Sequence, residues 1–162
     1  MKKLMLLISL MMLMACSPSS KYDQLIANRY QDDDVKNIKV TNSDPTTLKK
    51  AIQTEDYYFL VFETIGFYDG LVIGVEINKQ SLIISDAFII EHQETPDYGG
   101  VVDQGWFTKR YLNQSINTQT KVVQWISKSE DEIVAMTGAT ITSNAINAVI
   151  NQAKQYTKEI GE

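Results

Sequence analysis

The sequence contains few of the residues that build the commonest catalytic and metal sites. Its 162 residues include one cysteine, Cys16, and one histidine, His92. A single cysteine excludes an internal disulfide and a cysteine-based zinc site. No Gly-x-Ser-x-Gly, Walker or Rossmann glycine pattern is present, which disfavours hydrolase and nucleotide-fold functions. We interpret His92 as a loop or surface histidine, and the neighbouring Glu91 and Glu94 as either an acid–base pair or a charged loop face.

Basic charge is also scarce. The chain has 15 lysine and arginine residues against 20 aspartate and glutamate residues, which gives a formal net charge of −5. Nucleic-acid binding needs a basic surface that contacts phosphates, and the sequence contains no basic cluster. We therefore expect no nucleic-acid partner.

The first 15 residues have the layout of a secretory signal. A basic start precedes the apolar residues 4–13, which are too few to span a bilayer. The run ends in Leu-Met-Ala-Cys16, which resembles the lipobox of bacterial lipoproteins. That resemblance implies a signal peptide at residues 1–15, lipid attachment to Cys16, a lipid-anchored tether at 16–45, and localisation on the extracytoplasmic face of the cell membrane. The alternative is a buried structural cysteine after a short hydrophobic helix.

Cleavage before Cys16 would make the protein more acidic. Residues 1–15 contain two of the basic residues and none of the acidic ones, so the remaining chain has a net charge of −7. Its length is that of a single domain with one core.

The middle of the chain has the pattern of an antiparallel sheet. Residues 57–63 are largely aromatic and β-branched, which predicts a buried strand. Asp69-Gly70 is a two-residue hairpin signal, and apolar residues alternate along the strand predicted after it, at Leu71, Ile73, Val75 and Ile77. A third strand is predicted over residues 82–90. Three strands joined by short turns predict a β-meander.

Helical spacing appears towards both ends. Leu48 and Ile52 predict a short helix over residues 46–53, and apolar residues from Ile141 onward predict a C-terminal helix that ends near Gly161. Between them we expect a short helix over residues 104–112 and a fourth strand over 121–126. The predicted fold class is α+β: an antiparallel β-meander sheet with a C-terminal helix packed on it and a short N-terminal helix, with one domain over residues 46–162.

A hydroxyl-rich turn precedes the C-terminal helix. Residues 137–143 have the sequence Thr-Gly-Ala-Thr-Ile-Thr-Ser. Serine and threonine are common helix N-caps and glycine is a common turn residue, so an ordinary cap explains the spacing. A helix N-terminus also presents unpaired N–H groups and a positive dipole end, which favour a phosphate. Spacing alone leaves a cap, a phosphate site and covalent chemistry on a threonine open.

A second candidate region is the segment over residues 91–105. It is rich in turn-forming residues, and long loops that follow core strands often carry binding residues.

Three motifs, taken in order, resemble the FMN-binding domain found in the peripheral flavoprotein subunits of the Rnf complex and of the sodium-pumping NADH:quinone oxidoreductase. Residues 66–71, Gly-Phe-Tyr-Asp-Gly-Leu, resemble the family's Gly-Tyr-x-Gly-x-Ile hairpin. Residues 92–96, with Gly99 and Trp106, resemble its Glu-Thr-Pro-Gly loop. Residues 137–143 resemble its Ser/Thr-Gly-Ala-Thr-x-Thr-Ser flavinylation motif. Small bacterial lipoproteins built from this domain alone are also similar.

The resemblance implies a cofactor and its attachment. In the family, the threonine after Gly-Ala carries FMN through a phosphoester bond, which maps to Thr140. A separate flavin transferase makes this bond outside the cytoplasm from FAD, using magnesium. The cofactor-binding residues that we expect are Thr140, Thr137, Gly138, Ala139, Thr142, Ser143, Glu94, Thr95, Tyr98 and Trp106, without catalytic or metal-binding side chains.

The chain departs from the family pattern at two positions. Val134 stands where the family usually has an acidic residue that is thought to help the transferase, and Asp97 replaces the glycine after Pro96. The function implied is a lipid-anchored redox carrier that exchanges electrons with a membrane donor or redox complex. The alternative is a non-enzymatic ligand-binding or structural lipoprotein of the same fold without covalent flavin.

Overall fold

The computed structural model describes residues 21–39 and 48–161, and the predicted signal peptide and Cys16 lie outside them. The chain divides into two compact units, Met1–Gln31 and Asp32–Glu162. The first contains helix α1, Lys21–Arg29, within the range predicted as a tether. Arg29 Nε donates a hydrogen bond of 3.3 Å to the Tyr30 hydroxyl. In the described residues no helix combines the length and apolar character needed to cross a bilayer.

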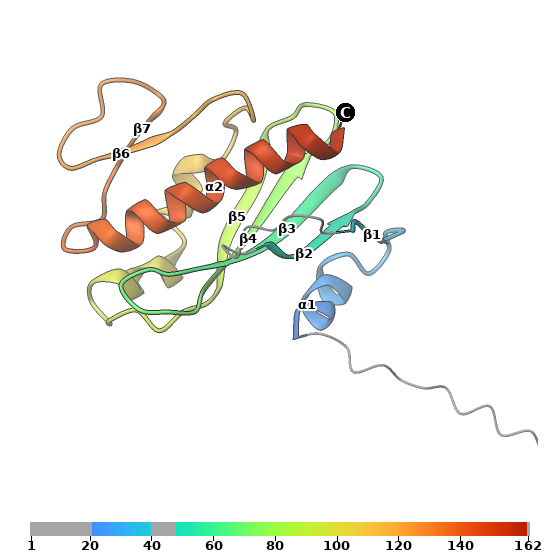
Figure 1. Cartoon of the computed structure of the whole chain (residues 1–162), viewed down its shortest axis with the longest axis horizontal. Coiled ribbons are helices and arrows are strands. Elements are labelled where there is room, and N and C mark those ends of the chain that lie inside the picture. The colour runs from blue at the N-terminus through green and yellow to red at the C-terminus, as the bar shows by residue number, and fades with distance from the viewer. Residues whose placement is uncertain (1–20, 40–47, 162) are drawn as a thin grey trace, which may run out of the picture. The chain divides into compact units, whose positions relative to one another are not determined.

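The second unit is built on a five-stranded antiparallel meander (Figure 1). Its strands follow chain order across the sheet: β1 (Lys36–Asn37), β2 (Leu48–Gln53), β3 (Tyr57–Thr64), β4 (Leu71–Asn78) and β5 (Ile84–Glu91). Strands β3 and β4 pair in continuous register from Tyr57↔Asn78 to Thr64↔Leu71. The predicted meander is therefore confirmed, and it has two more strands than the three expected.

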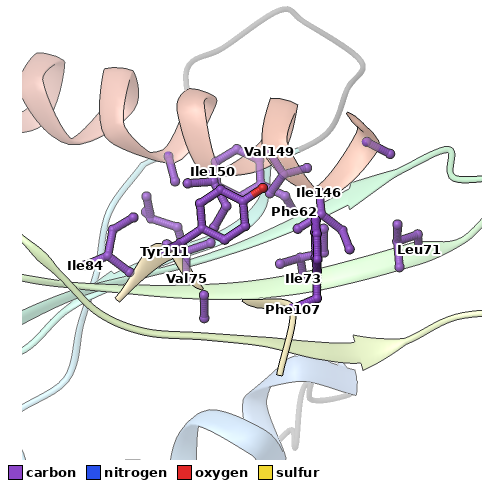
Figure 2. Close-up of a cluster of buried hydrophobic side chains, with 14 of the residues drawn as sticks. Phe62, Leu71, Ile73, Val75, Ile84, Phe107, Tyr111, Ile146, Val149 and Ile150 are labelled. Carbon is purple, nitrogen blue, oxygen red and sulfur yellow. The ribbon is translucent and has the colours of Figure 1, made fainter. Parts of the chain in front are cut away.

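The core lies between this sheet and the C-terminal helix α2, Thr140–Gly161. The helix contacts β3 and β4, and Figure 2 shows Ile146, Val149 and Ile150 facing Phe62 and Ile73. The alternating residues of β4 are fully buried, as predicted, but Val72, Gly74 and Glu76 between them are buried as well. Strand β4 is therefore covered on both faces, which a period-two pattern alone does not indicate.

The short helix predicted over residues 46–53 is wrong, because Leu48–Gln53 is strand β2 and the N-terminal helix lies at α1. Ala51 and Ile52 are buried, and β2 pairs with β3 through Ala51↔Leu60 and Ile52↔Phe59. A helix of eight residues is marginal by itself. The hydrogen-bonding edge of β3 outweighs the weak local preference of this segment.

The connection from β5 to α2 also differs from the prediction. In place of one helix over residues 104–112 there are two 3₁₀ helices, η1 (Gly99–Gln104) and η2 (Thr108–Tyr111). Phe107 and Tyr111 are buried as expected, whereas Trp106 is 37% exposed. The fourth predicted strand ends early, as β6 (Lys121–Val123), and pairs in parallel with β7 (Glu132–Val134) outside the main sheet.

A buried polar network attaches α2 to the segment before β6. Asn151 Oδ1 accepts hydrogen bonds from the Thr120 N–H and hydroxyl, both at 3.0 Å, and Asn147 Nδ2 donates to the Thr120 carbonyl at 3.0 Å. The Tyr111 hydroxyl donates to Asn147 Oδ1 at 3.3 Å, and burial raises the pKa of this phenol. These bonds fix the position of α2 over the sheet.

Candidate functional site

Three segments that are distant in the sequence meet at one end of the sheet. They are the β3–β4 hairpin, the loop that joins β5 to η1, and the turn that leads into α2. They enclose a cavity of about 470 Å³, within the usual range for small-molecule sites. Its lining residues are Phe67, Glu94, Thr95, Tyr98, Gly99, Gly138, Ala139, Thr140, Ile141 and Thr142.

The turn before α2 depends on a glycine. Gly138 has a φ of +74°, in the left-handed region that favours glycine. A Cβ at this position would also lie 2.7 Å from Cδ1 of Tyr98. The loop after β5 therefore contacts the turn directly, through the Tyr98 ring and the Gly138 backbone.

Thr140 is the first residue of α2, and it is exposed at the cavity. The preceding residue, Ala139, has no side-chain oxygen with which to cap the helix. The first N–H groups of an α-helix have no partner within the helix, and the macrodipole is positive there. The Thr140 hydroxyl therefore lies where an attached anionic group is stabilised.

The next two hydroxyls of the motif bond to the protein itself. Ser143 is fully buried; its hydroxyl donates to the Ala139 carbonyl at 2.8 Å and accepts the Met136 N–H at 2.9 Å. The Thr142 hydroxyl donates to Oε2 of Glu94 at 2.5 Å. In this arrangement Ser143 holds the turn and Thr142 holds the opposite loop.

Glu94 joins all three segments. It is 5% exposed. Its Oε1 accepts the N–H groups of Phe67 at 2.9 Å and Tyr68 at 3.2 Å, both in the hairpin, while Oε2 accepts the Thr142 hydroxyl. A Cβ on Gly66 or on Gly99 would collide with this carboxylate. The glycines of the hairpin and of η1 thus provide space for one particular side chain.

His92 supports the backbone at Glu94. Its Nδ1 accepts the Glu94 N–H at 3.0 Å, and its Nε2 lies 2.9 Å from Oδ1 of Asp103. This loop histidine, which is mostly buried, connects the end of β5 to η1. The sequence indicates no such role, because Asp103 is eleven positions away.

Asp97 lies at the tip of the same loop. Its φ is +66°, so the position where the family has glycine is left-handed here also. The Tyr98 and Gly100 N–H groups both donate to the Thr95 carbonyl, at 3.2 and 2.9 Å. These bonds close a tight turn that presents Tyr98 to the cavity.

Eight of the ten residues expected to bind the cofactor lie at this site, seven of them in the cavity lining and Ser143 beneath it. Thr137 is exposed and precedes the lining residues. Trp106 packs edge-on against Phe107, with the Arg110 guanidinium 4.8 Å from its ring centroid, and it does not line the cavity.

Two lining residues were not expected from the sequence, Phe67 and Ile141. Phe67 belongs to the hairpin motif, so its neighbourhood to Gly66 was an available signal. Ile141 fitted the apolar pattern of the helix, but it is 55% exposed and faces away from the core.

The surroundings of Val134 contain carboxylates with other partners. The Val134 carbonyl accepts Nη1 of Arg110 at 2.6 Å. The pKa of Glu132 is lowered, first by the Lys128 N–H that it accepts and then by Lys121. The pKa of Asp131 is lowered first by the Ser129 hydroxyl. Neither carboxylate lines the cavity.

The chemistry available at the cavity is binding rather than acid–base or metal chemistry. None of the described lining residues is basic, and the described part of the chain contains no group of three or more residues suited to hold a metal ion. Apolar and aromatic walls, hydroxyls and a helix N-terminus suit a flat, largely apolar ligand with an anionic group.

Comparisons with known proteins agree with this geometry. The family model described as FMN-binding domain matches residues 66–155. The NqrC-type component of the Na⁺-translocating NADH-quinone reductase from Parabacteroides distasonis has a similar structure, with a TM-score of 0.60 and 18% identity over 86% of this chain and 83% of that chain. NqrC from Shewanella oneidensis gives a TM-score of 0.53 and 14% identity over 78% and 70%. A comparison with curated proteins gives no match.

Proposed function

The chain belongs to the FMN-binding domain family, and on that basis we propose that it is a lipid-anchored electron-transfer flavoprotein that carries FMN on Thr140. The observation that carries the proposal is the position of Thr140. It is the first residue of α2, it is exposed, and it opens onto a cavity lined by aromatic side chains.

The start of α2 suits a covalently attached phosphate. A phosphoester retains one negative charge, and a charge near the first turn of a helix gains about 0.3–1 kcal/mol from the dipole. The left-handed Gly138 leaves the approach to Thr140 without a side chain. Because Thr142 and Ser143 bond to Glu94 and Ala139, we assign the phosphate contacts mainly to backbone N–H groups at the helix start.

Attachment requires a second protein and FAD. The Thr140 oxygen forms a bond to the phosphorus next to the flavin, the pyrophosphate bond of FAD breaks, AMP leaves and the threonine proton is released. A flavin transferase would catalyse this step outside the cytoplasm. Val134, with Asp131 and Glu132 engaged elsewhere, is the position where recognition by this enzyme departs from the family pattern.

The cavity walls suit a flavin ring. Phe67, Tyr98 and Ile141 line the cavity and are 59%, 57% and 55% exposed. Large apolar side chains gathered at a surface usually mark a binding site. A bound ring would cover them, and aromatic contacts with Phe67 and Tyr98 would orient it.

Electron transfer follows from the cofactor. Flavin supplies the redox chemistry, while the protein supplies binding, orientation and the surrounding charge. No side chain needs to act as a nucleophile or base. The NADH-quinone reductase proteins with the same fold support a membrane redox complex as the electron donor or acceptor.

The membrane connection rests on the N-terminal sequence. We propose removal of residues 1–15, acylation of Cys16 and a tether before the domain, which place the flavin at the extracytoplasmic face. A covalent bond would retain the flavin there, where free cofactor is not available to replace a lost one.

Intact-mass spectrometry of protein co-expressed with a flavin transferase tests the proposal. Wild-type protein should show the added masses of lipid and one FMN, with visible flavin absorbance that survives denaturation. Thr140→Ala should lose the flavin mass and keep the lipid mass, whereas Cys16→Ser should lose the lipid. Thr118→Ala, which removes a hydroxyl outside the cavity, should retain both.

The second candidate function makes the opposite prediction. A structural or ligand-binding lipoprotein of this fold would show the lipid mass without flavin in the wild type. It would be favoured by the presence of Val134 in place of the usual acidic residue. Flavin retained in Thr140→Ala would contradict the assignment of the attachment residue.

A further inference from the structure

We propose that Glu94 is a fixed negative charge beside the flavin and that it lowers the flavin's reduction potential; this inference rests on the function proposed above. The carboxylate lines the cavity and is 5% exposed. Solvent screens a charge in such a position much less than a charge on the surface.

The hydrogen bonds of Glu94 suit an ionised carboxylate. Oε1 accepts two backbone N–H groups, from Phe67 and Tyr68, and Oε2 accepts the Thr142 hydroxyl. An ionised carboxylate is an acceptor only, and all three of these contacts supply donors. Together they stabilise the charged form at a buried position.

No positive charge offsets this carboxylate locally. Within residues 21–39 and 48–161, no lysine, arginine or histidine forms an ion pair with Glu94, and the described lining residues include no basic side chain. The negative charge is shared with dipoles alone, so its field extends into the cavity.

The fold reserves space for this group. A Cβ at Gly66 would meet Oε1 of Glu94, and a Cβ at Gly99 would meet Oε2. His92 also accepts the Glu94 N–H at 3.0 Å, which fixes the backbone from which the side chain extends. Two glycines and four hydrogen bonds thus hold one carboxylate in one place.

The effect on the flavin is electrostatic. Reduction by two electrons with uptake of one proton adds one net negative charge to the ring. A like charge nearby raises the free energy of that reduced form more than that of the neutral oxidised form. Glu94 therefore shifts the equilibrium towards oxidised flavin and makes the reduced protein a stronger electron donor.

Potentiometric titration of the flavin-loaded proteins at about pH 8, above the ordinary carboxyl range, tests this inference, with dithionite as reductant and mediator dyes. Glu94→Gln keeps the shape: its amide oxygen can accept the two N–H groups, and its NH₂ can donate to Thr142. We expect at least a tenfold shift of the reduction equilibrium towards reduced flavin, which for a two-electron couple is about 30 mV upward.

Two controls separate charge from packing. Glu91→Gln removes the same charge from an exposed position on β5 and should leave the potential unchanged. Glu94→Asp keeps the charge and should stay nearer the wild type than Glu94→Gln does. Equal shifts in Glu94→Asp and Glu94→Gln would assign the effect to packing and overturn the inference.

A second variant covers the case in which Glu94→Gln does not fold, which thermal unfolding would reveal. Thr142→Val removes the hydroxyl that shares the negative charge, so the potential should move downward, opposite to the Gln variant. An unchanged or higher potential would count against Glu94. Absence of flavin from the wild type would overturn the proposed function together with this inference, whereas loaded Glu94→Gln with the wild-type potential would overturn the inference alone.

Discussion

The ring of Tyr98 lies against the backbone of Gly138, so closely that a Cβ on Gly138 would lie 2.7 Å from Cδ1 of the ring. Gly138 also has a φ of +74°. Two independent constraints therefore favour glycine here: the left-handed backbone and the contact with the loop after β5.

Gly138→Ala should destabilise the domain and weaken flavin loading. A non-glycine residue in the left-handed region costs about 1–2 kcal/mol, and displacement of Tyr98 adds to this cost. We expect a decrease of about 2 kcal/mol in the free energy of unfolding, measured by urea denaturation, with a lower flavin content by absorbance.

A double-mutant cycle separates the two causes. In a Tyr98→Ala background, Gly138→Ala should cost less, because only the backbone penalty remains. Tyr98 is 57% exposed, so Tyr98→Ala alone should change the stability of the flavin-free protein little. An equal cost of Gly138→Ala in both backgrounds would show that the ring contact contributes nothing.

Asp97 is a position at which the chain is less stable than it can be. Its φ of +66° is a conformation that glycine adopts without steric cost. Asp97→Gly should raise the free energy of unfolding by about 0.5 kcal/mol, and Asp97→Ala should lower it by about 1 kcal/mol. Thermal unfolding of the three proteins gives the order, and a glycine variant less stable than the alanine variant would contradict the backbone argument.

Lys154 should make stability depend on pH in the alkaline range. It is 2% exposed, and its ammonium donates to Gln114 Oε1 at 2.9 Å and to the Thr118 carbonyl at 2.8 Å. Burial, and to a smaller extent Lys158, lowers its pKa to about 8. An unfolded lysine titrates near about 10.4, so between these values the unfolded state binds more protons and the unfolding free energy rises with pH.

The slope between about pH 8 and pH 10.4 is therefore the measurement for Lys154. Lys154→Met removes the titrating group, so its unfolding free energy should rise less with pH than that of the wild type. Lys128→Met, at an exposed lysine in the β6–β7 connection, should keep the wild-type slope. Parallel pH profiles for the wild type and Lys154→Met would rule out a lowered pKa at Lys154.

Much of the sheet could be predicted because its signals are local. The alternation through Leu71, Ile73 and Val75 and the Asp69-Gly70 turn specify strand and hairpin with few competing structures. The C-terminal helix follows from its apolar stripe, although Ile146 and Ile150, both fully buried, were not in the predicted set. Three consecutive motifs likewise indicated the family and the segments that form the cavity.

The errors lie where long-range contacts decide. Leu48–Gln53 has weak local preferences and becomes a strand because β3 offers it a partner. Strands β6 and β7 pair in parallel across an intervening loop, a register that no local pattern encodes. The segment predicted as one helix divides at Gly105, which has a φ of +69° and ends η1.

The sequence by itself determined the α+β meander, the segments of the site and the threonine that is the attachment candidate, because periodicity, turn chemistry and a continuous motif are properties of neighbouring residues. Only the tertiary structure decided what the other side chains do. Glu94 and Thr142 are 48 positions apart, yet their hydrogen bond joins loop and helix beneath the cavity. Burial and hydrogen bonding depend on which surfaces meet after folding, so the sequence predicted these residues as cofactor contacts and the structure places them as a buried pair.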